Sequence, residues 1–443
     1  MPRDLLPLPA IPMPERVRPS LRGRSSQQRT ERRRASVRSA NEAVWALNFL
    51  HGSQSFSGAR PSTAQASSLA RLEEAALADP PPSPLPDPEA SLVEMLGSKA
   101  STYAGDDLSC VTAYRRDLVS WPASAGSVPL LDVLPDPERF DLAVGSGERL
   151  LLSPEELRGL RERDGVPRPY WDETLRADES AYFLFVRELV QRKMVTFRAK
   201  IRAEAGVFFV AKKNGRIRLV ADARRCNQHW IRPPSTRLAS TAAVVEHTAE
   251  DGESRFFSAQ DIADCYYQFS LPDGLVDLFG LKPVPARVAG ITSLDGEAVR
   301  PEIPVFPCLR VLPMGFSWAL HWTQQAHRNL LARAGLGGPD REWLDRAPSV
   351  PPRPGEPARL VYVDNELFIS GSPQDAEAAR IRASDSLGAL GLPLHEVVDH
   401  ASIIECVGLE LDRVKLQARL SAKRRWRLRQ AWAALRRHPF LSG

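Results

Sequence analysis

A hairpin-like segment at residues 359–370 constrains the fold of this chain more than any other feature. The runs RLVYV (359–363) and ELFIS (366–370) are largely apolar, β-branched or aromatic, and only Asp364 and Asn365 lie between them. Asn tolerates the left-handed backbone of a tight turn, so the pattern predicts two antiparallel strands. Strands this apolar belong in a buried sheet, which places Asp364 at the rim of that sheet.

A second acid occupies a similar place about a hundred residues earlier, where a strand expected over 255–260 ends at Asp261. A single Asp at a strand end is most often a turn former or a helix cap. Two acids at the rim of buried strands need compensation, however, and a divalent metal ion provides it. Two-metal phosphoryl transfer requires carboxylates that hold two Mg²⁺ ions about 4 Å apart. Asp261 and Asp364 are therefore predicted to bind metal.

Helices and a second hairpin surround these strands in the predicted α+β fold. Ser153 and Pro154 are typical of a helix start, and further helices are expected over 177–193, 315–333 and 373–390. The run VFFV (207–210) and the alternating run to residue 222 flank Asn214-Gly215, a strong hairpin signal. The edges and tip of this hairpin are basic, with Lys212, Lys213, Arg216 and Arg218.

Composition limits the class of protein. The chain has 443 residues and a net charge of +5, with no apolar run long enough to span a membrane and no secretory signal. Its five cysteines form no C-x-x-C pair, which argues against zinc and disulfides and suits an intracellular, reducing compartment, nucleus or cytoplasm.

Basic residues gather in two stretches of the chain. Residues 1–60 hold eleven Arg against four acids, and residues 413–437 hold ten Lys or Arg and no acid. Contact with a nucleic-acid backbone explains either stretch as well as a solvated tail or helix face does. The RRR at 32–34 is equally consistent with a nuclear address.

Four segments resemble reverse transcriptases, the RNA-directed DNA polymerases of retroelements, in order and spacing. They are RIRLVADARRCN (216–227) for the fingers motif, FFSAQDIADCYYQFSLP (256–272) for motif A, VLPMGFSWALHWTQQ (311–325) for motif B and LVYVDN (360–365) for motif C. ECVGLELD (405–412) weakly resembles the primer-grip hairpin. The resemblance covers about residues 176–420. It implies the fingers and palm of a right-hand polymerase, with an antiparallel palm sheet backed by helices.

The resemblance also implies a domain order. Residues 1–90 are expected to be mostly disordered, apart from a short helix over 41–52, and 91–150 to be partly ordered without a predicted fold. The remaining expected segments are the fingers-side helices and hairpin (151–255), the palm with an inserted fingers segment (256–412) and a basic helix that begins the thumb (413–443).

Roles for individual residues follow from the matched motifs. Asp261 and Asp364 match the ligands of Mg²⁺ (or Mn²⁺), and Asn365 occupies the third catalytic position. Tyr266 matches the bulky residue that excludes a ribose 2′-hydroxyl. The implied nucleotide-binding set is Lys213 (or Lys212), Arg218, Asp264, Cys265, Tyr266, Met314 and Gly315.

The chain departs from the family pattern at two places. Asn365 replaces the second Asp of motif C, and the lysine expected after the next helix is absent, with His395 and His400 in that region. We interpret His395 as a surface histidine. Glu366 should point to the opposite side of its strand, and Gln324 is interpreted as part of a polar helix face. Trp318, Trp322 and Leu330 are predicted to lie in the core.

The function predicted from these residues is synthesis of DNA on an RNA or DNA template with a primer, from deoxynucleoside triphosphates. A catalytically impaired, polymerase-fold nucleic-acid-binding protein is an alternative, supported by Asn365 and the missing lysine. An RNA-dependent RNA polymerase is another, against which the large ring of Tyr266 argues.

Overall fold

A computed structural model describes residues 5–15, 24–53, 55–77, 86–97, 111–212, 215–249, 255–294, 296–347, 351–414, 417–435 and 437. The chain divides into two compact units, Met1–Gly97 with Ala422–Gly443, and Ser98–Ser421. The functional domains predicted within 151–412 stay predictions. None of the helices in the described ranges is both long and apolar enough to cross a bilayer.

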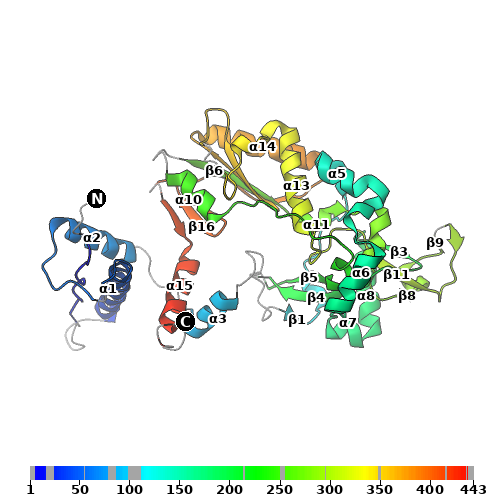
Figure 1. The fold of residues 1–443 in the computed structure, drawn as a ribbon, viewed down its shortest axis with the longest axis horizontal. Coiled ribbons are helices and arrows are strands. Elements are labelled where there is room, and N and C mark those ends of the chain that lie inside the picture. Colours follow the sequence, from blue (N-terminus) through cyan, green and yellow to red (C-terminus); the bar gives the residue numbers. More distant parts are fainter. Residues whose placement is uncertain are drawn as a thin grey trace. The chain divides into compact units, whose positions relative to one another are not determined.

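The larger unit is built around a four-stranded antiparallel sheet in the order β12-β13-β6-β14 (Figure 1). Its strands are β12 (Ala358–Tyr362), β13 (Asn365–Ser370), β6 (Phe256–Ile262) and β14 (Leu394–Ala401). The 359–370 hairpin is confirmed as β12 and β13, and the predicted strand before Asp261 is confirmed as β6. The mixture of helices and antiparallel sheets also confirms the α+β class.

Two helices pack on this sheet, α13 (Ala319–Leu331) and α14 (Pro373–Ala389), which lie near each other in Figure 1. Ala379 and Ala383 of α14 are completely buried with Val361 and Phe368 of the hairpin. Small side chains on the helix let it approach the large side chains of the strands closely, as close packing requires. The helix predicted over 315–333 is confirmed as α13, which begins at Ala319.

The other predicted elements of this unit are confirmed. Ser153 caps α6 (Pro154–Asp164) in a capping box with Glu156, and α8 spans Glu179–Gln191. The basic hairpin consists of β4 (Gly206–Ala211) and β5 (Ile217–Asp222), whose tip residues Lys213 and Asn214 lie outside the described residues. Trp318, Trp322 and Leu330 are buried, as predicted.

Shorter elements complete the larger unit. The strands are β1 (Val111–Thr112), β2 (Val128–Pro129), β3 (Val195–Arg198), β7 (Phe269–Ser270), β8 (Val284–Pro285), β9 (Ser293–Leu294), β10 (Glu297–Ala298), β11 (Pro304–Leu309), β15 (Ile403–Cys406), β16 (Leu409–Asp412) and β17 (Gln417–Leu420). The helices are α4 (Leu130–Val133), α5 (Asp136–Ala143), α7 (Glu173–Ala177), α9 (Arg224–Asn227), α10 (Thr241–Ala249), α11 (Cys265–Gln268) and α12 (Ala286–Ala289).

The basic C-terminal segment differs from the helix expected over 413–437. The helix α15 spans only Ala422–Leu435, because β17 comes before it and pairs with β16. Leu420 lies opposite Leu409 in that pairing, so the strand adds apolar area to the meander β15-β16-β17. A thumb role for α15 stays a prediction.

The smaller unit corrects the prediction of a largely disordered N-terminal region. Its described residues form α1 (Arg24–Leu50), α2 (Thr63–Leu77) and α3 (Pro88–Gly97). Val37, Ala40 and Val44 of α1 share a helix face and form a small core with α2 and the segment around Leu8. Asn48 adds two hydrogen bonds to the backbone of Leu8, at 2.6 and 2.8 Å. The spacing of these apolar residues was not recognised in the sequence, because Arg and Pro are abundant in this region.

Candidate active site

The two acids expected to bind metal lie at the same end of neighbouring strands. Asp261 of β6 is directly opposite Asn365 of β13, and the backbone N–H of Ile262 donates to the carbonyl of Asp364 at 3.0 Å. The antiparallel register of β6 and β13 therefore brings Asp261 and the tip of the predicted hairpin together.

The turn that carries Asp364 has an unusual backbone. Val363 adopts a φ of +59°, which a β-branched residue rarely accepts because its Cβ meets its own backbone. Asn365 donates its side-chain N–H to Asp364 Oδ1 at 2.8 Å. Asn365 therefore contacts the site in two ways. Its side-chain amide donates to Asp364, and its backbone lies opposite Asp261 on the neighbouring strand.

The ionised form of both acids is disfavoured, chiefly because both side chains are buried. Burial raises the pKa of Asp261 to about 6; His395 opposes this rise, whereas Asp364 and Glu396 add to it. Burial also raises the pKa of Asp364, against the effect of its hydrogen bonds with its own backbone and with Asn365. Two neighbouring acids whose ionised forms are disfavoured by burial form a site that favours a cation.

A cavity of about 310 Å³ opens over these acids. Of the predicted site residues, Asp261, Asp364, Arg218, Asp264, Cys265, Tyr266 and Met314 line it. Asn365 and Gly315 do not line it, and Lys213 lies outside the described residues. Lys212, the alternative to Lys213, does line the cavity, and its side chain donates to Ser120 Oγ at 2.9 Å. The cavity therefore places cations of the β4–β5 hairpin and acids of the sheet around one space.

Gly315 lies in the turn before α13, next to Met314, which lines the cavity. Its φ is +112°, and a Cβ at this position would lie 2.2 Å from the carbonyl oxygen of Ala221. The backbone N–H of Ala221 donates to the carbonyl of Met314 at 2.9 Å, so the turn before α13 is bound to the end of β5. Asn227 adds a hydrogen bond to the carbonyl of Gly315 at 3.1 Å. Only glycine fits this close approach without movement of the backbone.

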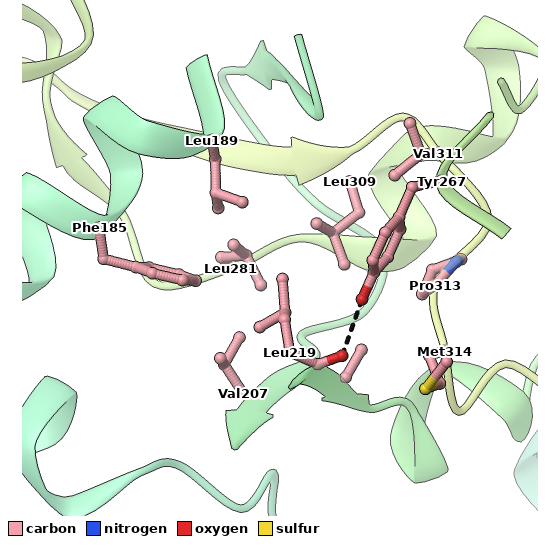
Figure 2. A pocket seen from close by; sticks show the side chains of 11 residues that line it. Phe185, Leu189, Val207, Leu219, Tyr267, Leu281, Leu309, Val311, Pro313 and Met314 are labelled. Atoms are coloured by element: carbon pink, nitrogen blue, oxygen red, sulfur yellow. Dashed lines mark hydrogen bonds between the residues drawn. The ribbon is translucent and has the colours of Figure 1, made fainter. Parts of the chain in front are cut away.

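Tyr267 connects the cavity floor to the basic hairpin. Figure 2 shows its hydroxyl donating to the carbonyl of Leu219, at 2.7 Å, across a small apolar cavity beside β5. Phe185 and Leu189 of α8 close the other side of that cavity. β5, which carries Arg218, is thereby fixed to α11, which carries Tyr266 and Cys265.

Two residues of β14, His395 and Glu396, also line the cavity, and the sequence interpretation missed both as site residues. His395 was interpreted as a surface histidine, yet its Nδ1 pairs with the carboxylate of Asp261, although half of the side chain is exposed. Glu396 follows it with a φ of +52°, where the pairing of β14 with β6 is irregular. A bulge of this kind re-aims side chains beside a site, and the sequence HEVV carries no signal for it.

The structure also corrects the interpretation of Gln324. Instead of forming a polar outer face, it is completely buried on α13. Its Oε1 accepts the N–H of Val363 at 2.7 Å, and its Nε2 donates to the carbonyl of Val361 at 3.1 Å. Gln324 therefore supports the backbone on which Asp364 sits. Glu366, by contrast, points away from the cavity as predicted, and is buried.

Within the described ranges, no group of three or more His, Cys, Asp or Glu side chains is arranged as a metal site. The cavity offers a carboxylate pair instead. That donor set suits Mg²⁺, which usually binds one or two carboxylates and takes its other ligands from water and substrate phosphates.

Comparisons with known proteins found no matching family model and no matching curated protein. Among solved structures, the chain is similar to the foamy viral protease-reverse transcriptase dRH in complex with double-stranded DNA, at 12% identity and a TM-score of 0.41, over 58% of this chain and 37% of that one. It is also similar to the foamy viral protease-reverse transcriptase in complex with double-stranded DNA, at 12% identity and a TM-score of 0.38, over 58% of this chain and 45% of that one. The chain thus spans less than half the length of either structure.

Proposed function

We propose that this protein is a template-directed DNA polymerase of the reverse-transcriptase type. The observation that carries the proposal is the cavity of about 310 Å³, which Asp261 and Asp364 line together with Lys212 and Arg218. Nucleotidyl transfer needs this combination, because the acids hold cations and the basic side chains neutralise the triphosphate.

Asp261 and Asp364 are the residues that would hold Mg²⁺ or Mn²⁺. Burial disfavours the ionised form of each carboxylate, and a bound divalent cation would favour it. When bound, the metal supplies activation of the primer 3′-hydroxyl and neutralises charge on the departing pyrophosphate. Asn365 holds Asp364 through its amide and contributes no charge of its own.

The other lining residues select and orient the nucleotide in this proposal. Lys212 and Arg218 bind its phosphates, and the backbone at Asp264 and Cys265 faces the same anion. Tyr266 is 8% exposed and presents its ring at the cavity, which leaves no room for a 2′-hydroxyl and favours deoxynucleotides. The substrates would be deoxynucleoside triphosphates and an RNA or DNA template with a primer. An origin in a retrotransposon-like element rests on the motif resemblance.

Primer extension on an RNA template tests the proposal directly. Wild-type protein should extend a labelled primer with deoxynucleotides and Mg²⁺ or Mn²⁺, and Asp364→Ala should reduce the rate by at least about a thousandfold. Glu377→Ala is a matched control, because Glu377 is a partly exposed acid of the same unit whose ion-pair partner among the described residues is His400, at 3.1 Å. Folded wild-type protein that extends no primer in either metal would contradict the proposal.

A second candidate function is favoured by one observation, the amide of Asn365 where a third acid is expected. A catalytically impaired protein with this fold would bind a primer–template without turnover. Its binding would persist in EDTA, whereas the polymerase should bind an incoming nucleotide only with metal present. Fluorescence anisotropy with a labelled deoxynucleotide in the presence of primer–template, with Mg²⁺ and with EDTA, separates the two functions.

A further inference from the structure

A buried histidine–glutamate pair lies directly beneath the turn that carries Asp364. His327 of α13 and Glu366 of β13 are completely buried or nearly so, and His327 Nε2 lies 3.1 Å from Glu366 Oε2. Glu366 is paired across the strands with Gln260, while the next pair, Asn365 with Asp261, belongs to the site end. The buried pair and the proposed metal ligands are therefore carried by the same two strands.

His327 binds both sides of the turn. Its Nδ1 donates to the carbonyl of Val363 at 2.8 Å, because a carbonyl can only accept. Val363 precedes Asp364 and Glu366 follows it by two residues, so one imidazole ring bridges the turn on either side of the acid. Val363 has a φ of +59°, a conformation that persists only where the surroundings hold it. The carbonyl of Val363 is held by His327 and its N–H by Gln324.

Glu366 is in turn fixed by a chain of polar contacts toward the second proposed ligand. Its other oxygen accepts the side-chain N–H of Gln260, the residue before Asp261. Gln260 Oε1 accepts from Ser384 Oγ of α14 at 2.6 Å. Arg380 lies beside this contact and binds Asp399 of β14 at 2.7 Å. The polar layer thus runs under β13, β6 and β14, the strands that bring Asp364, Asp261 and His395 to the cavity.

Stability alone gives a poor account of this pair. A buried ionic or strongly polar pair loses much of its attraction to desolvation, and well-packed apolar residues in its place are often neutral or stabilising. The pair has directional contacts to one backbone turn, which apolar residues cannot provide. A role in geometry explains this better than a role in the free energy of unfolding.

We propose that His327 and Glu366 are positioning residues that set the location of Asp364 relative to Asp261, an inference that rests on the proposed polymerase function. His327 holds the strained turn through Val363, and Glu366 ties that ring to Gln260 and so to the neighbouring strand. The buried pair makes the distance between the two acids independent of the nucleotide and its metal.

Four variants of the full chain test this inference: His327→Leu, Glu366→Leu, the double apolar variant and Thr323→Val. Thr323 is the matched control, because it is completely buried on the same helix and its hydroxyl contacts no polar partner in the described part of the chain. Each variant is measured by primer-extension kcat and KM, by melting temperature, and by hydrogen–deuterium exchange of residues 358–370 without metal.

His327→Leu should lower kcat by about a hundredfold, as expected for misplacement of a reacting group by about 1 Å, with KM for the nucleotide within about twofold. Exchange of the hairpin amides should become about tenfold faster. The double apolar variant should recover the melting temperature and neither kcat nor protection from exchange. Thr323→Val should match wild type in all three measurements.

Two results would overturn the inference: wild-type kcat and exchange in His327→Leu, or recovery of kcat together with stability in the double apolar variant. Failure of the polymerase proposal gives a different pattern. In that case wild-type protein makes no product in either metal, and the exchange of the hairpin in metal-free protein alone decides whether the pair fixes the turn.

Discussion

Asn365 lies directly across the β6–β13 pair from Asp261, and its amide donates a 2.8 Å hydrogen bond to the carboxylate of Asp364. One residue thus links the two acids of the site, through its side chain to Asp364 and through its strand pairing to Asp261, without adding charge. An aspartate in its place would lose this donor and would repel Asp364. It would also provide a third negative charge at a rim that already favours cations.

We predict that Asn365→Asp strengthens metal binding. The added charge should lower the Mg²⁺ concentration for half-maximal primer extension by about tenfold, because each nearby charge acts strongly in a partly buried site. Titration of Mg²⁺ in the extension assay measures this. Asn365→Ala is the control, since it loses the amide without gaining charge and should require more Mg²⁺. An unchanged Mg²⁺ requirement in Asn365→Asp would show that the amide already serves the site fully.

Tyr266 should decide which sugar the cavity accepts. Removal of the ring in Tyr266→Ala opens the cavity beside the proposed nucleotide, and the preference for deoxynucleotides over ribonucleotides should fall by about a hundredfold. Competition between dNTP and NTP in single-nucleotide extension measures the ratio. Tyr266→Phe keeps the ring and should keep the wild-type ratio. If Tyr266→Ala stays selective, the ring does not face the sugar.

The sequence predicted those helices and strands in which the local residue pattern agrees with the burial seen in the folded protein. The 359–370 hairpin and the helices α6, α8 and α14 carry apolar spacing, caps or turn residues that the tertiary structure preserves. The same agreement located the strand before Asp261, and with it the meeting of the two acids. Side-chain alternation also predicted that Glu366 points to the opposite side of its strand, where the structure buries it.

The rest depended on tertiary contacts that no local pattern encodes. Gln324 looked like a surface residue in the sequence, because the backbone N–H that it binds when buried belongs to Val363, 39 residues away. His395 reaches Asp261 because the two residues lie opposite each other in the pairing of β14 with β6, and no local pattern encodes which strands pair. In α1, the arginines at 32–34 and Arg38 drew attention away from the apolar face of Val37, Ala40 and Val44, which packs against α2.

The raised pKa of Asp261 predicts a pH dependence of stability without metal. The pKa is about 6 in the folded protein and 3.8 as the ordinary value, so the folded state binds the proton more tightly. This contribution to the free energy of unfolding is fully present below about pH 4 and is lost as the pH rises through 6. Its size is on the order of 3 kcal/mol, since one pKa unit corresponds to about 1.4 kcal/mol.

Urea unfolding between pH 4 and pH 7 measures this effect. Wild-type protein in EDTA should lose stability relative to Asp261→Asn as the pH rises, because the amide does not titrate. Added Mg²⁺ should reduce the loss at pH 7, where the ionised acid can bind it, and should have little effect at pH 4.5. Parallel curves for the two proteins in EDTA would show that Asp261 is not perturbed by burial.

Gly315 should tolerate no side chain, for two separable reasons. Its φ of +112° is disfavoured for any other residue, and a Cβ would collide with the carbonyl oxygen of Ala221 at 2.2 Å. Gly290 isolates the first reason, because its φ is +68° and nothing lies within 4 Å of an added Cβ. Gly290→Ala should cost about 1 kcal/mol of unfolding free energy, and Gly315→Ala about 3 kcal/mol. Chemical denaturation measures both values.

The collision at Gly315 should also act on the site, because relief of the contact must move the turn at Met314 away from β5. Gly315→Ala should therefore raise the KM for the incoming nucleotide, since Met314 and Arg218 line the same cavity from the two elements that separate. Gly290→Ala should leave KM unchanged, which distinguishes a shift of the cavity wall from a general loss of stability. Equal destabilisation by the two variants, with equal KM, would mean that β5 yields to the added methyl group and that its bond to the turn does not shape the cavity.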